Sequence, residues 1–333
     1  YIETTRPLVV LTAPGPGSGK LATCLSQLYH ENKRGVKAGY SKFETFPIWN
    51  LPLNHPVNVA YEAATADLKD VNKVDNFHLE AYGEITVNYN RDIEVFPVVS
   101  SILAKITGKE CIYKSPTDMG VNMAGYCIVD DEVCREASKK EILRRYYKAL
   151  CDLKRGDCKK DTVERLEFLM SRLGITQATR PVVERAREKS GQNDDCGAVA
   201  LELQDGRIVT GKNTQRMSAP AACVFNAVKM LAGIKDSQKL ISPYVIGPII
   251  DMKTKILKEH DKTLTLEEAL LALSICAASD ATAATAMEQL TQLDGCDAHS
   301  THILHKADEN PFRKLGVRLS SDPEFLGDTL FNE

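Results

Sequence analysis

The sequence predicts an α/β protein with two domains: an N-terminal P-loop-like α/β layer with a mainly parallel sheet, and a C-terminal α+β domain with a hairpin and several helices. Three observations predict this class. The apolar run Leu8–Leu11 leads into a glycine-rich turn and a helix-compatible segment. Two apolar runs flank Asp205-Gly206, which is a strong hairpin signal. The length of 333 residues is that of about two domains.

Elements of the first half follow from apolar spacing and from proline and glycine breaks. We expect Leu8–Leu11 to be a buried central strand. Helices are expected after it at 21–29, 58–68, 101–107, 132–154 and 162–173. One strand is expected at 42–46, ending at Pro47. The charged segment 180–190 reads as a linker helix. We place the domain boundary near 175–195, giving domains at 1–175 and 176–333.

The second domain opens with the hairpin, whose apolar runs are 198–203 and 208–210. A helix is expected to follow Pro220 through Ala232. An alanine-rich pair of helices at 266–278 and 280–293 should pack closely. The last elements expected are strands at 301–304 and 317–319 and a helix near 311–315.

Composition excludes several classes of function. The chain is 43% apolar and 26% charged, as in ordinary soluble proteins, and its formal net charge is −3. No polybasic surface therefore indicates a nucleic-acid partner, and no run of about 18 apolar residues indicates a membrane span. None of the ten cysteines forms C-x-x-C, so we expect all ten to be unbridged thiols in a reducing, cytoplasmic setting. A homo-oligomer is compatible with this composition.

The segment after Leu11 has the chemistry of a phosphate cradle. Backbone N–H groups at a helix N-terminus face an anion, and glycines let the backbone approach it. The sequence therefore predicts a small phosphorylated ligand, such as ATP or another nucleotide with Mg²⁺. The residues expected to bind it are Gly15, Gly17, Ser18, Gly19, Lys20 and Thr23.

The loop departs from the Walker A pattern, G-x-x-x-x-G-K-[ST]. Pro14 stands at the first glycine position, and Leu21 replaces the hydroxyl residue that would bind Mg²⁺. Thr23 and Ser18 do not have the required offset. A glycine- and proline-rich turn that only redirects the chain stays open as the alternative.

Three further residues are candidates for catalysis. Arg91 has the planar fork that binds phosphate, although a buried structural Arg–Asp pair is an equal alternative. Asp92 or Asp118 would serve as a metal ligand or a base. Asp130 and Asp131 follow an apolar run as in a Walker B strand, but a helix cap is the favoured interpretation. The histidines at 299, 302 and 305 are not expected to form a metal site.

Several longer segments carry a family resemblance. APGPGSGKLAT (13–23), KFETFPIWNLP (42–52), NYNRDIEVFPV (88–98) and SPTDMGVNM (115–123) are similar to a bacterial family known as domain of unknown function 1846. The similarity continues through LELQDGRIVTGK (201–212). The resemblance implies that this chain corresponds to the C-terminal two-thirds of longer members, whose remaining part would add to the sheet. It implies a bacterial source without implying a catalytic residue.

Two classes of function stay open. The first is a nucleotide-dependent enzyme, such as a phosphotransferase or ligase acting on a small molecule. The second is a non-catalytic sensor of a phosphorylated ligand, or a scaffold in which the glycine-rich turn is structural. Dependence on Mg²⁺ distinguishes them, because a phosphotransferase bridges its phosphates with the metal.

Overall fold

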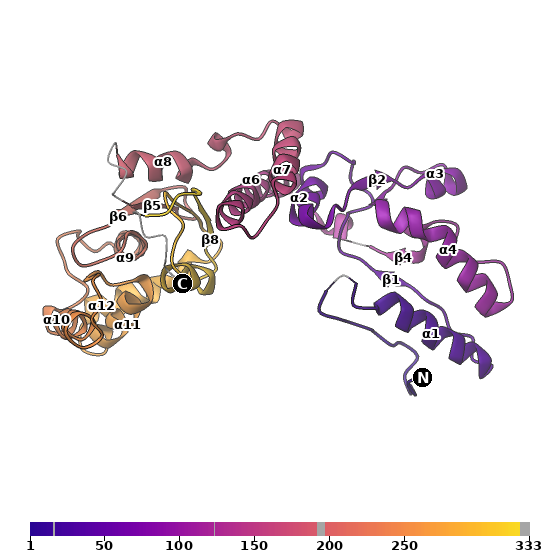
Figure 1. Cartoon of the computed structure of the whole chain (residues 1–333), viewed down its shortest axis with the longest axis horizontal. Coiled ribbons are helices and arrows are strands. Elements are labelled where there is room, and N and C mark those ends of the chain that lie inside the picture. The colour runs from indigo at the N-terminus through magenta and orange to yellow at the C-terminus, as the bar shows by residue number, and fades with distance from the viewer. Residues whose placement is uncertain (16, 123, 192–196, 327–333) are drawn as a thin grey trace. The chain divides into compact units, whose positions relative to one another are not determined.

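The computed structural model describes residues 1–15, 17–122, 124–191 and 197–326 (Figure 1). These residues form a mixed α/β protein in which helices predominate and the strands are short. They divide into two compact units, Tyr1–Ser138 and Lys139–Glu333. In the described part of the chain, no helix is both long enough and apolar enough to span a bilayer.

The first unit contains short helices around two minimal sheets. In chain order its elements are α1 (Lys20–Lys33), β1 (Lys42–Phe43), α2 (Pro56–Ala64), the 3-10 turn Ala66–Leu68, β2 (Asn72–Val74), α3 (Asn76–Tyr82), β3 (Val87–Tyr89), α4 (Asn90–Thr107), α5 (Pro116–Met119), β4 (Gly120–Val121) and the 3-10 turn Ala124–Cys127. β1 pairs with β4 in parallel, and β2 pairs with β3 antiparallel. The mainly parallel sheet expected here is therefore wrong for the described residues.

The expected central strand at Leu8–Leu11 is also wrong. No strand is formed there, and the side chains of Leu8, Val9 and Val10 are 78%, 56% and 75% exposed. A strand needs a neighbour that accepts and donates its backbone hydrogen bonds, and no described segment takes that place. The apolar run alone predicted burial, but burial depends on the partner surface.

The core of the first unit lies between α1 and α4. Leu28 from α1 packs in one cluster with Phe96, Val99 and Leu103 from α4, and Met119 joins it. α4 begins directly after β3, so the first turn of α4 lies beside the end of that strand. This arrangement places Tyr89 and Asp92 beside Lys42 of β1.

The second unit is built around a four-stranded sheet. Its elements are α6 (Asp131–Arg155, which begins in the first unit), α7 (Lys160–Leu173), the 3-10 turn Gln177–Thr179, α8 (Pro181–Ser190), β5 (Ala198–Glu202), β6 (Ile208–Lys212), α9 (Ala219–Leu231), α10 (Pro243–Asp251), the π-helical turn Met252–Ile256, α11 (Leu266–Ala277), α12 (Ala281–Glu288), the 3-10 turn Gln289–Leu293, β7 (Asp297–Ser300), α13 (Lys306–Lys314) and β8 (Arg318–Ser321). The strand order is β6-β5-β7-β8. β5 is antiparallel to both neighbours, and β7 and β8 are parallel.

The predicted hairpin is confirmed, with Leu201 opposite Val209 and Gly206 in the left-handed conformation that its turn requires. The expected strand at 301–304 lies instead at Asp297–Ser300. Alternation along the hairpin gives each face its own helix. Ala200 and Ile208 pack against Val182 and Ala186 of α8. The opposite face packs against α9 and supplies the main core.

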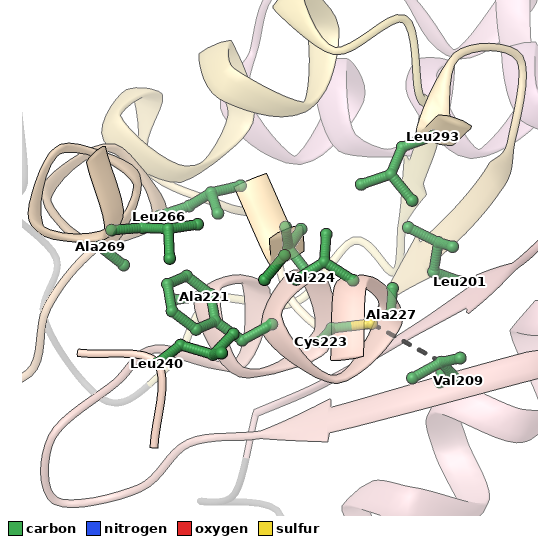
Figure 2. Close-up of a cluster of buried hydrophobic side chains, with 14 of the residues drawn as sticks. Leu201, Val209, Ala221, Cys223, Val224, Ala227, Leu240, Leu266, Ala269 and Leu293 are labelled. Atoms are coloured by element: carbon green, nitrogen blue, oxygen red, sulfur yellow. Dashed lines mark hydrogen bonds between the residues drawn. The ribbon is translucent and has the colours of Figure 1, made fainter. Parts of the chain in front are cut away.

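Figure 2 shows this main core around α9. Val224 and Ala227 of α9 pack among buried residues from the sheet, from α11 and from the loop after α9, including Leu201, Leu240 and Leu266. The Cys223 thiol donates to the backbone oxygen of Val209, with sulfur and oxygen 3.6 Å apart. None of the nine described cysteines is bridged in a disulfide, as expected, and Cys196 lies outside the described residues.

Candidate functional site

The glycine-rich loop ends at the N-terminus of α1. Gly17 and Gly19 have φ angles of +72° and +83°, in the left-handed region that favours glycine. Gly19 is the N-cap of α1, and no side chain caps this helix end. A Cβ atom added at Gly15, Gly17 or Gly19 would meet no atom within 4 Å, so the loop borders open space. Pro16 lies outside the described residues.

Side-chain hydrogen bonds join three of the six predicted ligand-binding residues. The Lys20 ammonium donates to the backbone oxygen of Gly15 at 2.8 Å and to Ser18 Oγ at 3.2 Å. Ser18 Oγ in turn donates to the oxygen of Gly15 at 2.6 Å. The first turn of α1 contains no acidic residue, and Lys20 forms no ion pair within the described part of the chain. Thr23 is exposed one turn further along, with its N–H bonded to Gly19.

Asp92 lies in a compact charged cluster of the same unit. It is in the first turn of α4. Lys42 of β1 extends its ammonium to the carboxylates of both Asp92 and Glu44. The Glu44 residue is only 8% exposed. Sequence reasoning missed Lys42 and Glu44, although a spacing of two in the strand expected at 42–46 would place both on one face.

Burial determines the titration of this cluster. Loss of water raises the pKa of the Glu44 carboxyl to about 7, because the positive charge of Lys42 offsets burial only in part and the negative charge of Asp92 adds to it. The carboxylates in turn raise the pKa of Lys42 against the effect of its own burial. A carboxyl that titrates near neutrality beside a second carboxylate and an ammonium has the composition of a general acid–base site.

Aromatic rings border the charged cluster. The Lys42 ammonium lies 5.9 Å from the centre of the Tyr89 ring. The rings of Tyr61 and Tyr89 are 5.3 Å apart, and Phe46 stacks on Tyr61 at 5.2 Å. Burial raises the pKa of the Tyr89 hydroxyl, so this group stays protonated.

The other two catalytic candidates occupy structural positions. The Arg91 guanidinium binds the buried carboxylate of Asp70 at 2.7 Å, which is the Arg–Asp pair that the sequence left open. The Asp118 carboxylate accepts hydrogen bonds from the Tyr82 hydroxyl at 3.1 Å and from the N–H of Lys114 at 2.9 Å. No hydrogen bond or ion pair between described residues joins Arg91, Asp92 and Asp118 to one another.

The helix cap at Asp130 is the interpretation that the structure supports. Asp130 Oδ1 accepts from the N–H of Val133 at 3.2 Å, and Asp131 binds His55 Nε2 at 2.9 Å. The preceding residues form a 3-10 turn and not a Walker B strand. Among the described residues, no group of three histidine, cysteine, aspartate or glutamate side chains is arranged to hold a metal. His299 is buried and bonds Ser320 Oγ at 2.9 Å.

Two family models match the chain over almost its full length. The model for the N-terminal domain of DUF1846, a domain of unknown function, matches residues 1–174, and the model for the C-terminal domain matches residues 178–331. The expectation that the chain is only the C-terminal part of the family is therefore wrong, because it matches the N-terminal domain model as well as the C-terminal one. The models meet near residue 175, whereas the compact units divide at 138/139, so the expected domain boundary stays a prediction.

Bacterial proteins of the same kind are close relatives. UPF0371 proteins of Clostridioides difficile strain 630 and of Clostridium botulinum strain Alaska E43 are each 56% identical over 338 residues, covering 99% of this chain and 68% and 67% of those proteins. A UPF0371 protein of Clostridium tetani is also 56% identical. The chain belongs to the DUF1846 family.

Proposed function

We propose that this DUF1846 protein binds a phosphorylated small molecule or nucleotide at the loop Gly15–Lys20. The observation that supports it best is the N-terminus of α1, where Gly19 leaves the first-turn N–H groups without a side-chain cap. The open space beside the glycines gives an anion room to approach the backbone. These are the two requirements of a phosphate cradle.

Electrostatics favours an anion at the same place. The dipole of a helix is equivalent to about half a positive charge at its N-terminus. Lys20 adds a full charge that is held only by neutral acceptors, the Gly15 carbonyl and the Ser18 hydroxyl. A phosphate oxygen would accept a stronger, charge-assisted hydrogen bond from the same ammonium. Lys20 would therefore exchange its carbonyl partner for the ligand.

The chemistry proposed for this unit is nucleotide-dependent phosphotransfer or ligation. Glu44, with a pKa of about 7, would accept the proton of the attacking group, and Asp92 and Lys42 would set its charge state. ATP and Mg²⁺ are the cofactors proposed. Because Leu21 replaces the usual hydroxyl ligand, Mg²⁺ dependence should be weaker than in a standard P-loop enzyme.

One observation favours the alternative, a non-catalytic sensor of the same ligand. Arg91 and Asp118 are already engaged by Asp70 and by Tyr82 and Lys114. Neither side chain is then free to neutralise phosphate charge or to hold a metal without breaking an existing contact. A sensor would bind the nucleotide without turnover and without a requirement for Mg²⁺.

Calorimetric titration of the full 333-residue chain tests the proposal. ATP, GTP and pyrophosphate are added with and without Mg²⁺, to wild type, Lys20→Ala, Gly17→Val and the control Lys33→Ala at the other end of α1. Lys20→Ala removes one charge-assisted hydrogen bond, which is worth about 1.5–3 kcal/mol. The variant should therefore bind the ligand at least about tenfold more weakly than wild type. Gly17→Val should weaken binding further, because valine does not tolerate the left-handed backbone.

The same titrations contain the results that would refute the proposal. No binding of any of the three ligands, or binding that Lys20→Ala and Lys33→Ala affect equally, would leave the loop as a structural turn. Release of ADP or phosphate during incubation with ATP, abolished by Glu44→Gln, would favour the enzyme over the sensor.

A further inference from the structure

A pocket of about 350 Å³ lies in the second unit, beside the sheet edge formed by β6. Its floor is apolar and consists of side chains that also belong to the main core: Phe225, Leu240, Ile241 and Ile246. Its rim carries five cationic side chains, which are Lys189, Lys212, Arg216, Lys229 and Lys239. The volume falls within the range of pockets that hold small organic ligands.

The fold brings these cations together from distant parts of the sequence. β6 is the edge strand of the sheet, and α8 and α9 cover opposite faces of the β5–β6 hairpin. Lys189 is in the last turn of α8, Lys229 is in the last turn of α9, and Lys212 ends β6 between them. The pocket therefore wraps around the sheet edge.

Among the residues that the structure describes, no side chain neutralises the cations of the rim. No carboxylate lines the pocket, and the five side chains form no ion pair within the described ranges. The Lys229 ammonium donates to the backbone oxygen of Asp236 at 2.9 Å. Burial lowers the pKa of Lys229, and the nearby charge of Asp236 opposes this only in part. In a chain of net charge −3, such a concentration of unpaired positive charge focuses an attractive field on anions.

The strand edge adds backbone donors to the pocket. Asn213 donates its N–H to Gly197, so odd-numbered residues of β6 face β5. The oxygen of Thr210 faces outward and accepts from Asn226 Nδ2 at 2.9 Å. The N–H of Thr210 points to the same outward side, because both polar groups of a residue in an antiparallel strand share a direction. This donor is available to a ligand at the rim.

We propose that this pocket binds an organic phosphate that contains a ring. The ring would pack on the apolar floor, and two or more negative charges of the ligand would lie among the five rim cations. The site would be a second anion site, separate from the Gly15–Lys20 loop and in the other compact unit. The apolar floor is what distinguishes the ligand from an inorganic anion, since phosphate alone has no surface to bury there.

The experiment uses ADP as the probe and the double variant Gly17→Val, Lys20→Ala as the background, in which both substitutions weaken binding at the loop. Calorimetric titration of the full chain should retain ADP binding in this background. A variant that combines this background with Lys212→Ala, Arg216→Ala and Lys239→Ala should bind ADP at least about tenfold more weakly. The reason is that the positive field that concentrates the anion is lost. All three side chains are exposed, so the fold should survive their removal.

A matched control removes the same charges elsewhere. The control is the triple variant Lys262→Ala, Arg313→Ala, Lys314→Ala in the same background. These three side chains are also exposed and lie in the same unit but outside the pocket. This control should leave ADP affinity within about twofold, as distant charges are screened at physiological salt. An equal loss in both triple variants would overturn the proposal and indicate attraction by net charge alone.

Related ligands give a second readout. Pyrophosphate should bind more weakly than ADP because it lacks the ring, and adenosine should bind more weakly because it lacks the charges. Absence of ADP binding in the Gly17→Val, Lys20→Ala background would overturn this site while leaving the loop proposal intact. Pyrophosphate binding as tightly as ADP, or a single-stranded oligonucleotide binding more tightly than ADP, would overturn the assignment to a small organic phosphate.

Discussion

Arg180 and Asp297 form a buried ion pair, with Nη1 and Oδ1 2.9 Å apart and side chains only 1% and 6% exposed. The same guanidinium donates through Nη2 to the backbone oxygens of Ala298 at 3.2 Å and Arg318 at 2.9 Å. Arg180 precedes α8, so one side chain ties that helix to β7 and β8. The sheet and α8 therefore depend on a buried charge that Asp297 compensates by direct contact, with a further contribution from the charge of Glu141.

Removal of Asp297 should be strongly destabilising. Asp297→Ala leaves the Arg180 charge buried without its carboxylate, and such losses cost about 3–5 kcal/mol. Urea unfolding of the variant measures this as a lower midpoint. The exposed pair Arg185–Glu188 is the control, and Arg185→Ala should leave the urea midpoint nearly unchanged because solvent screens that pair. Equal effects of the two substitutions would contradict the structural role of Arg180.

Local sequence signals predicted much of the second unit. Asp205-Gly206 identified the hairpin because the turn chemistry is local, and the periodicity of 132–154 and 162–173 identified α6 and α7 within two residues. The segment 180–190 was predicted as a charged linker helix. Its first residue, Arg180, is in fact buried, because Asp297, 117 positions away, supplies the compensating charge.

The site was harder to predict because its parts meet through tertiary packing. The glycine loop is contiguous, so its residues were found together. The partners of Asp92 are Lys42 and Glu44, 50 and 48 positions earlier, and no local spacing joins them. The prediction of a buried strand at Leu8–Leu11 was wrong for the same reason. An apolar run indicates a preference for burial but does not specify the surface that would cover it.

Acid should weaken the second unit through Asp322. Burial alone would raise the pKa of this carboxyl, but hydrogen bonds and charge from His299 and Arg187 lower it to about 2. The unfolded state then binds more protons between pH 3.8 and 2, so the stabilisation is complete above pH 3.8 and is lost as pH falls through 2. Asp322→Asn should remove about 2 kcal/mol at pH 7 and much less at pH 2.

Unfolding by urea at several pH values checks the Asp322 prediction. Burial also lowers the pKa of His299 below the ordinary value of 6.5. As the pH falls below 6.5, the unfolded state takes up a proton that the folded state does not, so the native state loses stability through this group as well. In the Asp322→Asn variant the steep loss between pH 4 and 2 should vanish. The dependence near neutrality should remain and grow, because Asp322 raises the pKa of His299 in the wild type. A wild-type chain equally stable at pH 2 and pH 5 would contradict the low pKa of Asp322.

Gly211 should tolerate no larger residue. A Cβ atom at this position would lie 2.6 Å from the Cα of Cys223 and closer still to its backbone nitrogen, so β6 and α9 would have to separate. Overpacking of this kind costs about 1–3 kcal/mol, which Gly211→Ala should show as a lower thermal midpoint. Gly247→Ala in α10, where a Cβ meets nothing within 4 Å, is the matched control and should be neutral or stabilising. A destabilisation by Gly247→Ala as large as that by Gly211→Ala would show that the close approach to α9 is not the cause.

The Glu44 carboxyl should titrate near pH 7 in the folded chain, because burial and the charge of Asp92 outweigh the charge of Lys42. For an acid with a raised pKa the folded state holds the proton more tightly, so this contribution to stability is complete below pH 4.5 and is lost as pH rises through 7. Asp92→Asn removes the negative neighbour and should lower the pKa of Glu44, while Lys42→Met should raise it. Carbon-13 NMR of the side-chain carboxyl, assigned with Glu44→Gln, reads each value directly. A wild-type midpoint near 4.5, or one that Asp92→Asn and Lys42→Met shift in the same direction, would remove the basis for acid–base chemistry at this cluster.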